Sequence, residues 1–165
     1  MITGSAALFG VSLGALVTAQ VQKRQWALGR QVDACAAIVV ESTRLQLAIR
    51  RHWKHQVDVD WGAWNDALAE ISLVADGAVV DAAGEVDAVF WQQTERIERG
   101  QVIEEADWFA VTAVMEEVRL DFVNSAKRHV IGSTRRLAQL PVRRPAGYMP
   151  GTVQGPASLD PPVDP

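Results

Sequence analysis

The chain has 165 residues, 48% of them apolar, and a formal net charge of -4. This length suffices for one domain with a hydrophobic core, and so mild a charge does not indicate nucleic-acid binding. The single cysteine, Cys35, excludes an internal disulfide.

The N-terminal segment, residues 1–22, contains no charged side chain. As a helix it would be about 33 Å long, enough to cross a hydrocarbon core about 30 Å thick. The sequence therefore predicts a single transmembrane anchor. Lys23, Arg24 and Arg30 follow it and no cation precedes it, so we expect the N-terminus outside and the remaining chain in the cytoplasm. Trp26 suits the membrane interface, or else the core of the next helix.

Two alternatives for this segment remain open. A cleaved signal peptide is one, because Val17-Thr18-Ala19 resembles a cleavage site, although the positive charge that usually begins such signals is missing. A soluble or peripheral helix is the other, because serine, threonine and glutamine interrupt the apolar run.

Small residues recur every fourth position in the predicted anchor and form one helix face: Ala6, Gly10, Gly14 and Thr18. In lipid, such a face lets two helices approach closely and pack. In a water-soluble helix, each of the two glycines would cost about 1 kcal/mol relative to alanine. The pattern therefore predicts a homo-oligomer that packs through this face.

The next segment, residues 23–140, has helical periodicity and no period-two run of β-branched residues. We expect an all-α fold in which the transmembrane helix continues into an antiparallel bundle of three to four long helices. The predicted apolar stripes are Leu28, Val32, Cys35, Val39, Ile49 and Trp53; Trp61, Trp64, Leu68, Ile71 and Ala75; Val79, Ala83, Val86, Phe90 and Ile97; and Trp108, Val111, Met115, Val118 and Phe122. Ser42 and Gln46 weaken the first stripe.

Breaks between these helices are expected near Asp60, at Asp76-Gly77, at Arg99-Gly100 and at Gly132. All seven prolines lie at or after Pro141. Since proline cannot continue a helix, residues 141–165 are predicted to form a disordered Pro-rich tail.

Charge is distributed unevenly along the chain. Residues 23–54 carry seven Lys or Arg and two acids, residues 58–121 carry three Arg and sixteen acids, and residues 122–144 carry six cations and no acid. One interpretation is that the basic first helix lies against acidic neighbours. The other is that the last six cations contact lipid or another polyanion: Lys127, Arg128, Arg135, Arg136, Arg143 and Arg144.

Candidate chemical groups are few. His52, His55 and Asp58 have a spacing compatible with zinc, which keeps a metal-binding protein or enzyme as an alternative. No phosphate loop, Rossmann glycine pattern, nucleophile elbow or HExxH motif occurs in the sequence. We therefore expect no cofactor, and an enzyme is the less favoured class.

Three stretches, "GVSLGALVTAQVQKRQWALGRQ", "ALAEISLVADGAVVDAAGEV" and "EEVRLDFVNSAKRHVIG", give the chain its layout. In this layout it resembles a loose set of uncharacterised actinobacterial small membrane proteins, with an N-terminal transmembrane helix and a helical cytoplasmic domain. The resemblance implies no activity. We expect a non-enzymatic, membrane-anchored scaffold or interaction module with an unknown cytoplasmic protein partner. A membrane-active toxin or holin-like protein is an alternative.

Overall fold

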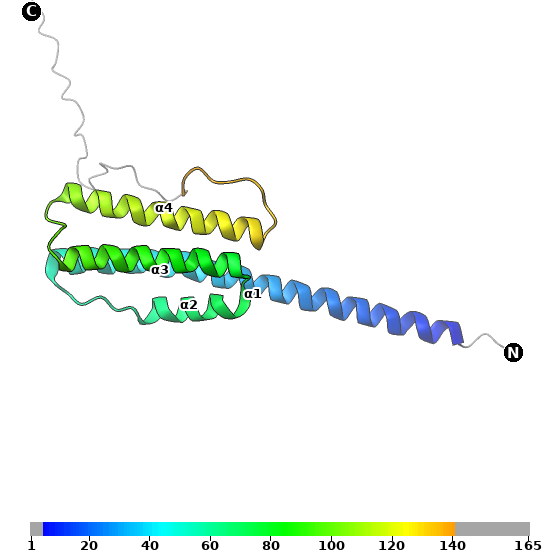
Figure 1. The fold of residues 1–165 in the computed structure, drawn as a ribbon. Helices are drawn as coiled ribbons and strands as arrows, with labels where there is room; N and C mark the ends of the chain where they lie inside the picture. Colours follow the sequence, from blue (N-terminus) through cyan, green and yellow to red (C-terminus); the bar gives the residue numbers. More distant parts are fainter. Residues whose placement is uncertain (1–4, 141–165) are drawn as a thin grey trace, which may run out of the picture.

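The computed structural model describes the backbone of residues 5–140 and the side chains of residues 20–140. Within this part of the chain, all regular structure is helical: α1 (Ser5–His55), α2 (Gly62–Val74), α3 (Gly77–Glu98) and α4 (Glu105–His129). The predicted all-α class is confirmed (Figure 1). The predicted tail, residues 141–165, lies outside the described residues.

The four helices form an antiparallel bundle in which only the C-terminal half of α1 takes part (Figure 1). At one end of the bundle, Gln31 Nε2 of α1 donates to the Val74 carbonyl at 2.7 Å, and Ser125 Oγ of α4 donates to the Ala78 carbonyl at 3.2 Å. We call this the stalk end, because α1 extends beyond the bundle here. At the other, far end, Trp53 Nε1 of α1 donates to the carbonyl of Val102 at 2.8 Å.

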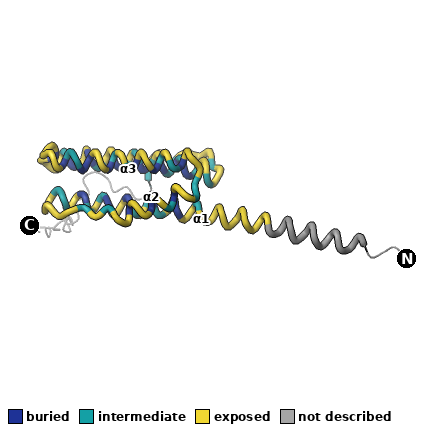
Figure 2. Tube along the Cα trace, turned by 60° about the horizontal axis from the view of Figure 1, so that its bottom comes forward, coloured by how far each residue is buried: buried dark blue, intermediate teal, exposed yellow. Residues whose placement is uncertain are grey.

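The first helix is much longer than the bundle. Its 51 residues span about 76 Å at 1.5 Å per residue. We call residues 20–30 the stalk, because every one of them is exposed where α1 leaves the bundle (Figure 2). The chain contains no proline before Pro141, so nothing of that kind interrupts α1.

The predicted anchor gains no support from the structure. In the part of the chain that is described, no helix combines the length and apolar character that crossing a bilayer requires. Residues 1–19, which include Ala6, Gly10, Gly14 and Thr18, lie outside the residues whose side chains are described. The anchor and its packing face therefore stay predictions.

The predicted core stripe of α1 is confirmed only near the end of the helix, where Ile49 is buried and Trp53 packs against the core; before Ile49 its phase is wrong. Leu28 and Val32 are exposed, and Cys35 and Val39 are only half-buried. The buried positions of α1 are Ala34, Ile38, Ser42, Leu45 and Ile49. The sequence pattern was misleading because small or polar side chains occupy two of these core positions, while larger apolar ones lie beside them.

The stripes predicted for the other helices are largely confirmed. In α3, all five predicted residues are buried. In α2 and α4 the stripes are right in phase, with Trp61, Leu68, Ala75 and Val118 half-buried at their edges. These apolar faces meet α1 in one continuous core.

Local signals set the helix ends. Asp76, at a predicted break, caps α3 by accepting a hydrogen bond from the Val79 amide at 3.2 Å. At the start of α4, Glu104 and Asp107 form a reciprocal capping box. The amides of Glu104 and Ile103 donate to the Asp107 carboxylate, which lowers the pKa of Asp107 below its usual value. Gly100 and Gly132 adopt positive φ where the chain leaves α3 and α4.

Tryptophan rings join the helices. The ring pairs are Trp53–Trp108, Trp61–Trp91 and Trp64–Phe90, with centroids 5.4, 5.4 and 6.2 Å apart. Trp64 is 2% exposed, and its Nε1 donates to Asp87 Oδ1 at 2.7 Å. Trp26 differs from these residues because it lies on the stalk and is 72% exposed.

Candidate functional site

A buried guanidinium lies between α1 and α4. Arg119 is only 6% exposed. Its Nε donates to Ser42 Oγ at 2.9 Å, and its Nη2 donates to the Ser42 carbonyl at 3.2 Å and to Gln46 Oε1 at 2.8 Å. The guanidinium carbon lies 5.7 Å from the centre of the Phe90 ring, within the range of a cation–π contact.

The surroundings of Arg119 suit a structural role. Burial lowers the pKa of Arg119, and the nearby carboxylate of Glu116 acts in the opposite direction. The three hydrogen bonds described above all cross from α4 to α1, so they fix the register of these two helices. Ser42 and Gln46, which weakened the predicted stripe, are therefore the acceptors of this cluster.

Sequence reasoning missed this cluster, although a signal for it exists. Arg119 follows Met115 by four residues and precedes Phe122 by three, so it falls at a core position of the predicted α4 stripe. Two polar residues, Ser42 and Gln46, interrupt the α1 pattern. A cation in one stripe and two acceptors in another indicate that the stripes meet.

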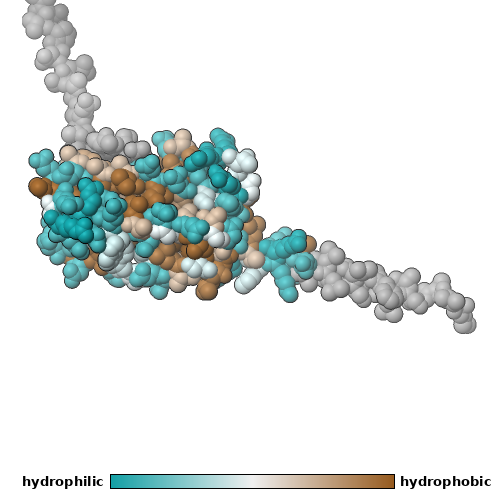
Figure 3. All heavy atoms as spheres, viewed as in Figure 1, coloured by the Kyte–Doolittle hydropathy of each residue, from teal (hydrophilic) through white to brown (hydrophobic). Residues whose placement is uncertain are grey.

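The stalk carries the first group of predicted interface residues. Lys23 and Arg24 are exposed, next to the exposed indole of Trp26. Figure 3 shows the hydrophilic surface of the described stalk beside the bundle. Arg30 differs, because its Nη2 lies 3.0 Å from Glu70 Oε1 of α2, in an exposed ion pair. Arg30 therefore also joins the stalk to the bundle.

Some of the second group of predicted cations lie at the stalk end of the bundle. Lys127 Nζ donates to the carbonyl of Arg135 at 2.9 Å, and Arg128 and Arg135 are exposed. Arg136 is engaged within the molecule, 3.2 Å from Asp121 Oδ1. Arg143 and Arg144 lie outside the described residues. These cations are about a hundred residues from those of the stalk in sequence, yet α4 ends where α1 leaves the bundle (Figure 1).

Large apolar side chains are exposed at this end as well. Leu73, at the end of α2, is 85% exposed, and Ile131, just after α4, is 64% exposed. Both belong to the stalk end, because Val74 receives the hydrogen bond of Gln31 and His129 lies 3.8 Å from Asp76 at the start of α3. The stalk end thus combines exposed cations with exposed apolar tips.

The interpretation of the charge layout as pairing between helices is confirmed at two points. Besides the pair of Arg30 with Glu70, Lys54 Nζ of α1 lies 2.5 Å from Glu105 Oε1 of α4. Both pairs are exposed, and such pairs typically contribute about 0–1 kcal/mol each. They favour the observed neighbours of α1 more than they stabilise the fold.

The residues of the metal alternative lie at the far end. His52 Nδ1 lies 2.9 Å from the carbonyl of Val57, just beyond the end of α1. His55 borders a shallow hollow of about 620 Å³, and Asp58 is exposed in the following loop. Within the described residues, no group of three or more His, Cys, Asp or Glu side chains is placed to hold a metal ion.

Comparison of the chain with protein-family models, with curated proteins and with solved structures finds no match. The resemblance to small actinobacterial membrane proteins therefore stays a prediction.

Proposed function

We propose that the protein is a non-enzymatic helical interaction module, tethered to a membrane through residues 1–22, that presents its bundle to a partner in the cytoplasm. One observation carries the proposal: exposed cations and exposed apolar side chains gather at the end where α1 leaves the bundle. Trp26, Leu73 and Ile131 supply the apolar side chains, and Lys23, Arg24 and Arg128 supply charge.

Electrostatics supports this orientation. Arg30 lies eight positions after Gln22 in α1, which places the stalk end about 12 Å from the proposed membrane boundary. The Debye length at physiological ionic strength is about 8 Å, so the cations nearest the boundary feel an anionic leaflet most strongly. Each Lys or Arg close to such a surface contributes about 1 kcal/mol. An exposed tryptophan is also favourable at the level of the headgroups.

Cell fractionation tests the tether. We expect the full-length chain to sediment with membranes and to resist a high-salt wash, whereas residues 23–165 alone are released by salt. The physical reason is that the uncharged leader is the only segment proposed to enter hydrocarbon. A protease-accessible tag should be cleaved from outside at the N-terminus and protected at the C-terminus. Full-length protein recovered as a monomer without detergent would contradict the proposal, and a mature chain beginning after Ala19 would indicate a cleaved signal instead.

Self-association through the small-residue face is a second part of the proposal. Replacing Gly10 and Gly14 with leucine should lower the yield of crosslinked dimer in membranes at least several-fold, because the larger side chains keep the two helices apart. Ser12→Leu is a suitable control, since residue 12 lies about 200° round the helix from residue 10. Unchanged dimer levels in the double variant would rule out this packing face.

A further inference from the structure

An exposed, largely apolar face runs along α1, on the side of this helix that is turned away from the core. We call it the outer face. Its described residues, all exposed, are Val21, Gln25, Leu28, Gly29, Val32, Ala36, Val40, Thr43 and Leu47. Val32, Val40 and Leu47 are 42%, 46% and 55% exposed, although they lie within the bundle part of α1. The outer face is therefore an apolar surface that the fold leaves uncovered.

The outer face repeats every 11 residues. Val21, Val32 and Thr43 form one row, and Gln25, Ala36 and Leu47 form another. Residues 11 apart in an α-helix lie only about 20° apart round its axis, so both rows stay on one side of α1. From residue 21 to residue 47 the face is about 39 Å long, and it passes from the stalk into the bundle without a break.

The same repeat leads back to the small-residue face of the predicted anchor. Gly10 lies 11 positions before Val21, and Gly14 lies 11 positions before Gln25. Because α1 is one continuous helix, these positions share one side of it. The small-residue face and the outer face are thus successive parts of a single surface.

Two further features suit the outer face to packing against another helix. None of its residues is charged, whereas Lys23, Arg24 and Arg30 lie elsewhere round the stalk. A Cβ atom at Gly29 would meet nothing within 4 Å, so no contact inside the described chain requires a glycine there. A glycine in a helix interior costs about 1 kcal/mol relative to alanine. Close approach of a second helix backbone is one use for it.

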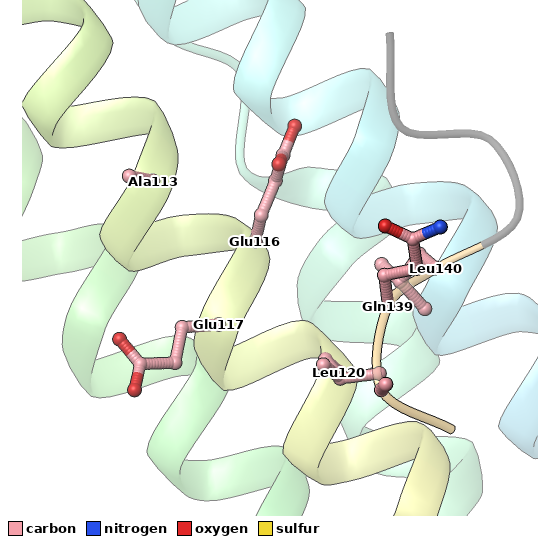
Figure 4. A pocket seen from close by; sticks show the side chains of 7 residues that line it. Ala113, Glu116, Glu117, Leu120, Gln139 and Leu140 are labelled. Carbon is pink, nitrogen blue, oxygen red and sulfur yellow. The ribbon is translucent and has the colours of Figure 1, made fainter. Parts of the chain in front are cut away.

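The outward side of α4 is different, because the segment that follows α4 returns along it. We call residues 133–140 the strap. Asn124 Nδ2 donates to the Leu137 carbonyl at 3.1 Å, and the Leu137 amide donates to Asn124 Oδ1 at 2.7 Å. Where the strap ends, a hollow of about 360 Å³ is lined by Ala113, Glu116, Glu117, Leu120, Ala138, Gln139 and Leu140. Figure 4 shows its two glutamates extending from α4, so this side is both partly covered and charged.

We propose that the outer face of α1 packs against the same face of a second copy of this chain, with the two α1 helices parallel. The parallel direction rests on the proposed membrane tether, because a tether gives both copies one orientation in one membrane. The occupant must extend along the stalk and the bundle, and a second α1 has that length. The pairing ends near Leu47, since Arg50, Arg51 and Lys54 follow on this side and would meet the same cations of the other copy.

Disulfide crosslinking between copies tests the pairing in the full-length protein, in whichever cell fraction contains it. In a Cys35→Ser background, Gln25→Cys and Ala36→Cys should each give about tenfold more crosslinked dimer than Ala27→Cys, because a disulfide requires Cα atoms within about 7 Å. Ala27 is the matched control, since it is exposed and lies about 200° round the stalk from Gln25.

Two crosslinking results would overturn the proposal. One is an equal yield of dimer from Gln25→Cys and Ala27→Cys, which would mean that the outer face is not the contact. The other is a disulfide between a Gln25→Cys copy and a Leu47→Cys copy, which would mean that the two helices are antiparallel.

A charge variant checks the outer face in the chain with its native cysteine. Val32→Lys with Val40→Lys should lower co-isolation of two differently tagged copies at least about tenfold, because like charges would face each other. Val57→Lys with Ile103→Lys adds the same charge at exposed positions of the far end and should leave co-isolation unchanged. Far-UV circular dichroism verifies that each variant is folded. Equal loss in both double variants, or loss in neither, would overturn the proposal.

The same measurements separate this inference from the proposed tether and from the small-residue face. If Gly10→Leu with Gly14→Leu leaves the Ala36→Cys dimer intact, the outer face pairs without the small-residue face. If the leucines abolish co-isolation and the lysines at residues 32 and 40 do not, the outer face is not an interface. Crosslinks at residues 25 and 36 in protein recovered without membranes would support the pairing while removing the tether.

Discussion

Replacing Arg119 with alanine is expected to lower the free energy of unfolding by about 2–4 kcal/mol. The substitution removes the donors that Arg119 supplies to the Ser42 hydroxyl oxygen and to the amide oxygen of Gln46. It also opens a cavity between α1 and α4 beside the Phe90 ring. Thermal unfolding of the full-length protein, followed by far-UV circular dichroism, measures the loss.

Two companion variants separate burial from charge. Arg128→Ala removes an exposed cation from the same helix, and we expect a change within about 0.5 kcal/mol. Ser42→Ala combined with Arg119→Met replaces donor and acceptor together, so it should destabilise less than the sum of the two single changes. If Arg119→Ala proves as mild as Arg128→Ala, the guanidinium does not fix the register of α1 and α4.

Trp64→Ala should have the larger effect, about 3–5 kcal/mol of lost unfolding free energy. The indole is 2% exposed and is stacked near Phe90, and its N–H donates to Asp87. The substitution leaves a large cavity between α2 and α3 and deprives the half-buried Asp87 carboxylate of a hydrogen bond.

Trp26→Ala is the matched control for Trp64→Ala. Because Trp26 is 72% exposed on the stalk, its loss should leave the unfolding transition within about 0.5 kcal/mol of native. Thermal unfolding followed by far-UV circular dichroism measures the free energy of unfolding of both variants. A similar destabilisation from the two substitutions would mean that the stalk packs against part of the molecule, contrary to the exposure described above.

The buried faces of the helices could be predicted in part from the spacing of apolar residues. Particular residues explain where this prediction failed. In α3 most of the large apolar side chains face the core, with Trp91 as an exposed exception, so their spacing gave the correct face. In α1 the core face includes Ala34 and Ser42, while Leu28 and Val32 are exposed, so counting large apolar residues selected the wrong phase before Ile49. Periodicity detects a face only when that face is the more apolar one.

The candidate site was less accessible to sequence reasoning. The cations of the stalk and those near residue 128 were recognised separately, since local sequence shows charge but not which ends of the helices meet. Their common location follows from tertiary contacts such as that between Gln31 and Val74. The bidentate contact of Asn124 with the strap has no sequence signature either, because it depends on backbone conformation at Leu137.

One mechanical consequence follows from the continuity of α1, which includes both the stalk and one wall of the bundle. Because neither a proline nor a loop lies between the stalk and the bundle part of α1, α1 has no hinge there about which one part could rotate without the other. Turning the stalk about its own axis must carry Ile38 and Ile49 round with it, against a close-packed interior. A rotation of α1 at its N-terminal end would therefore also change the packing of α1 against the other three helices.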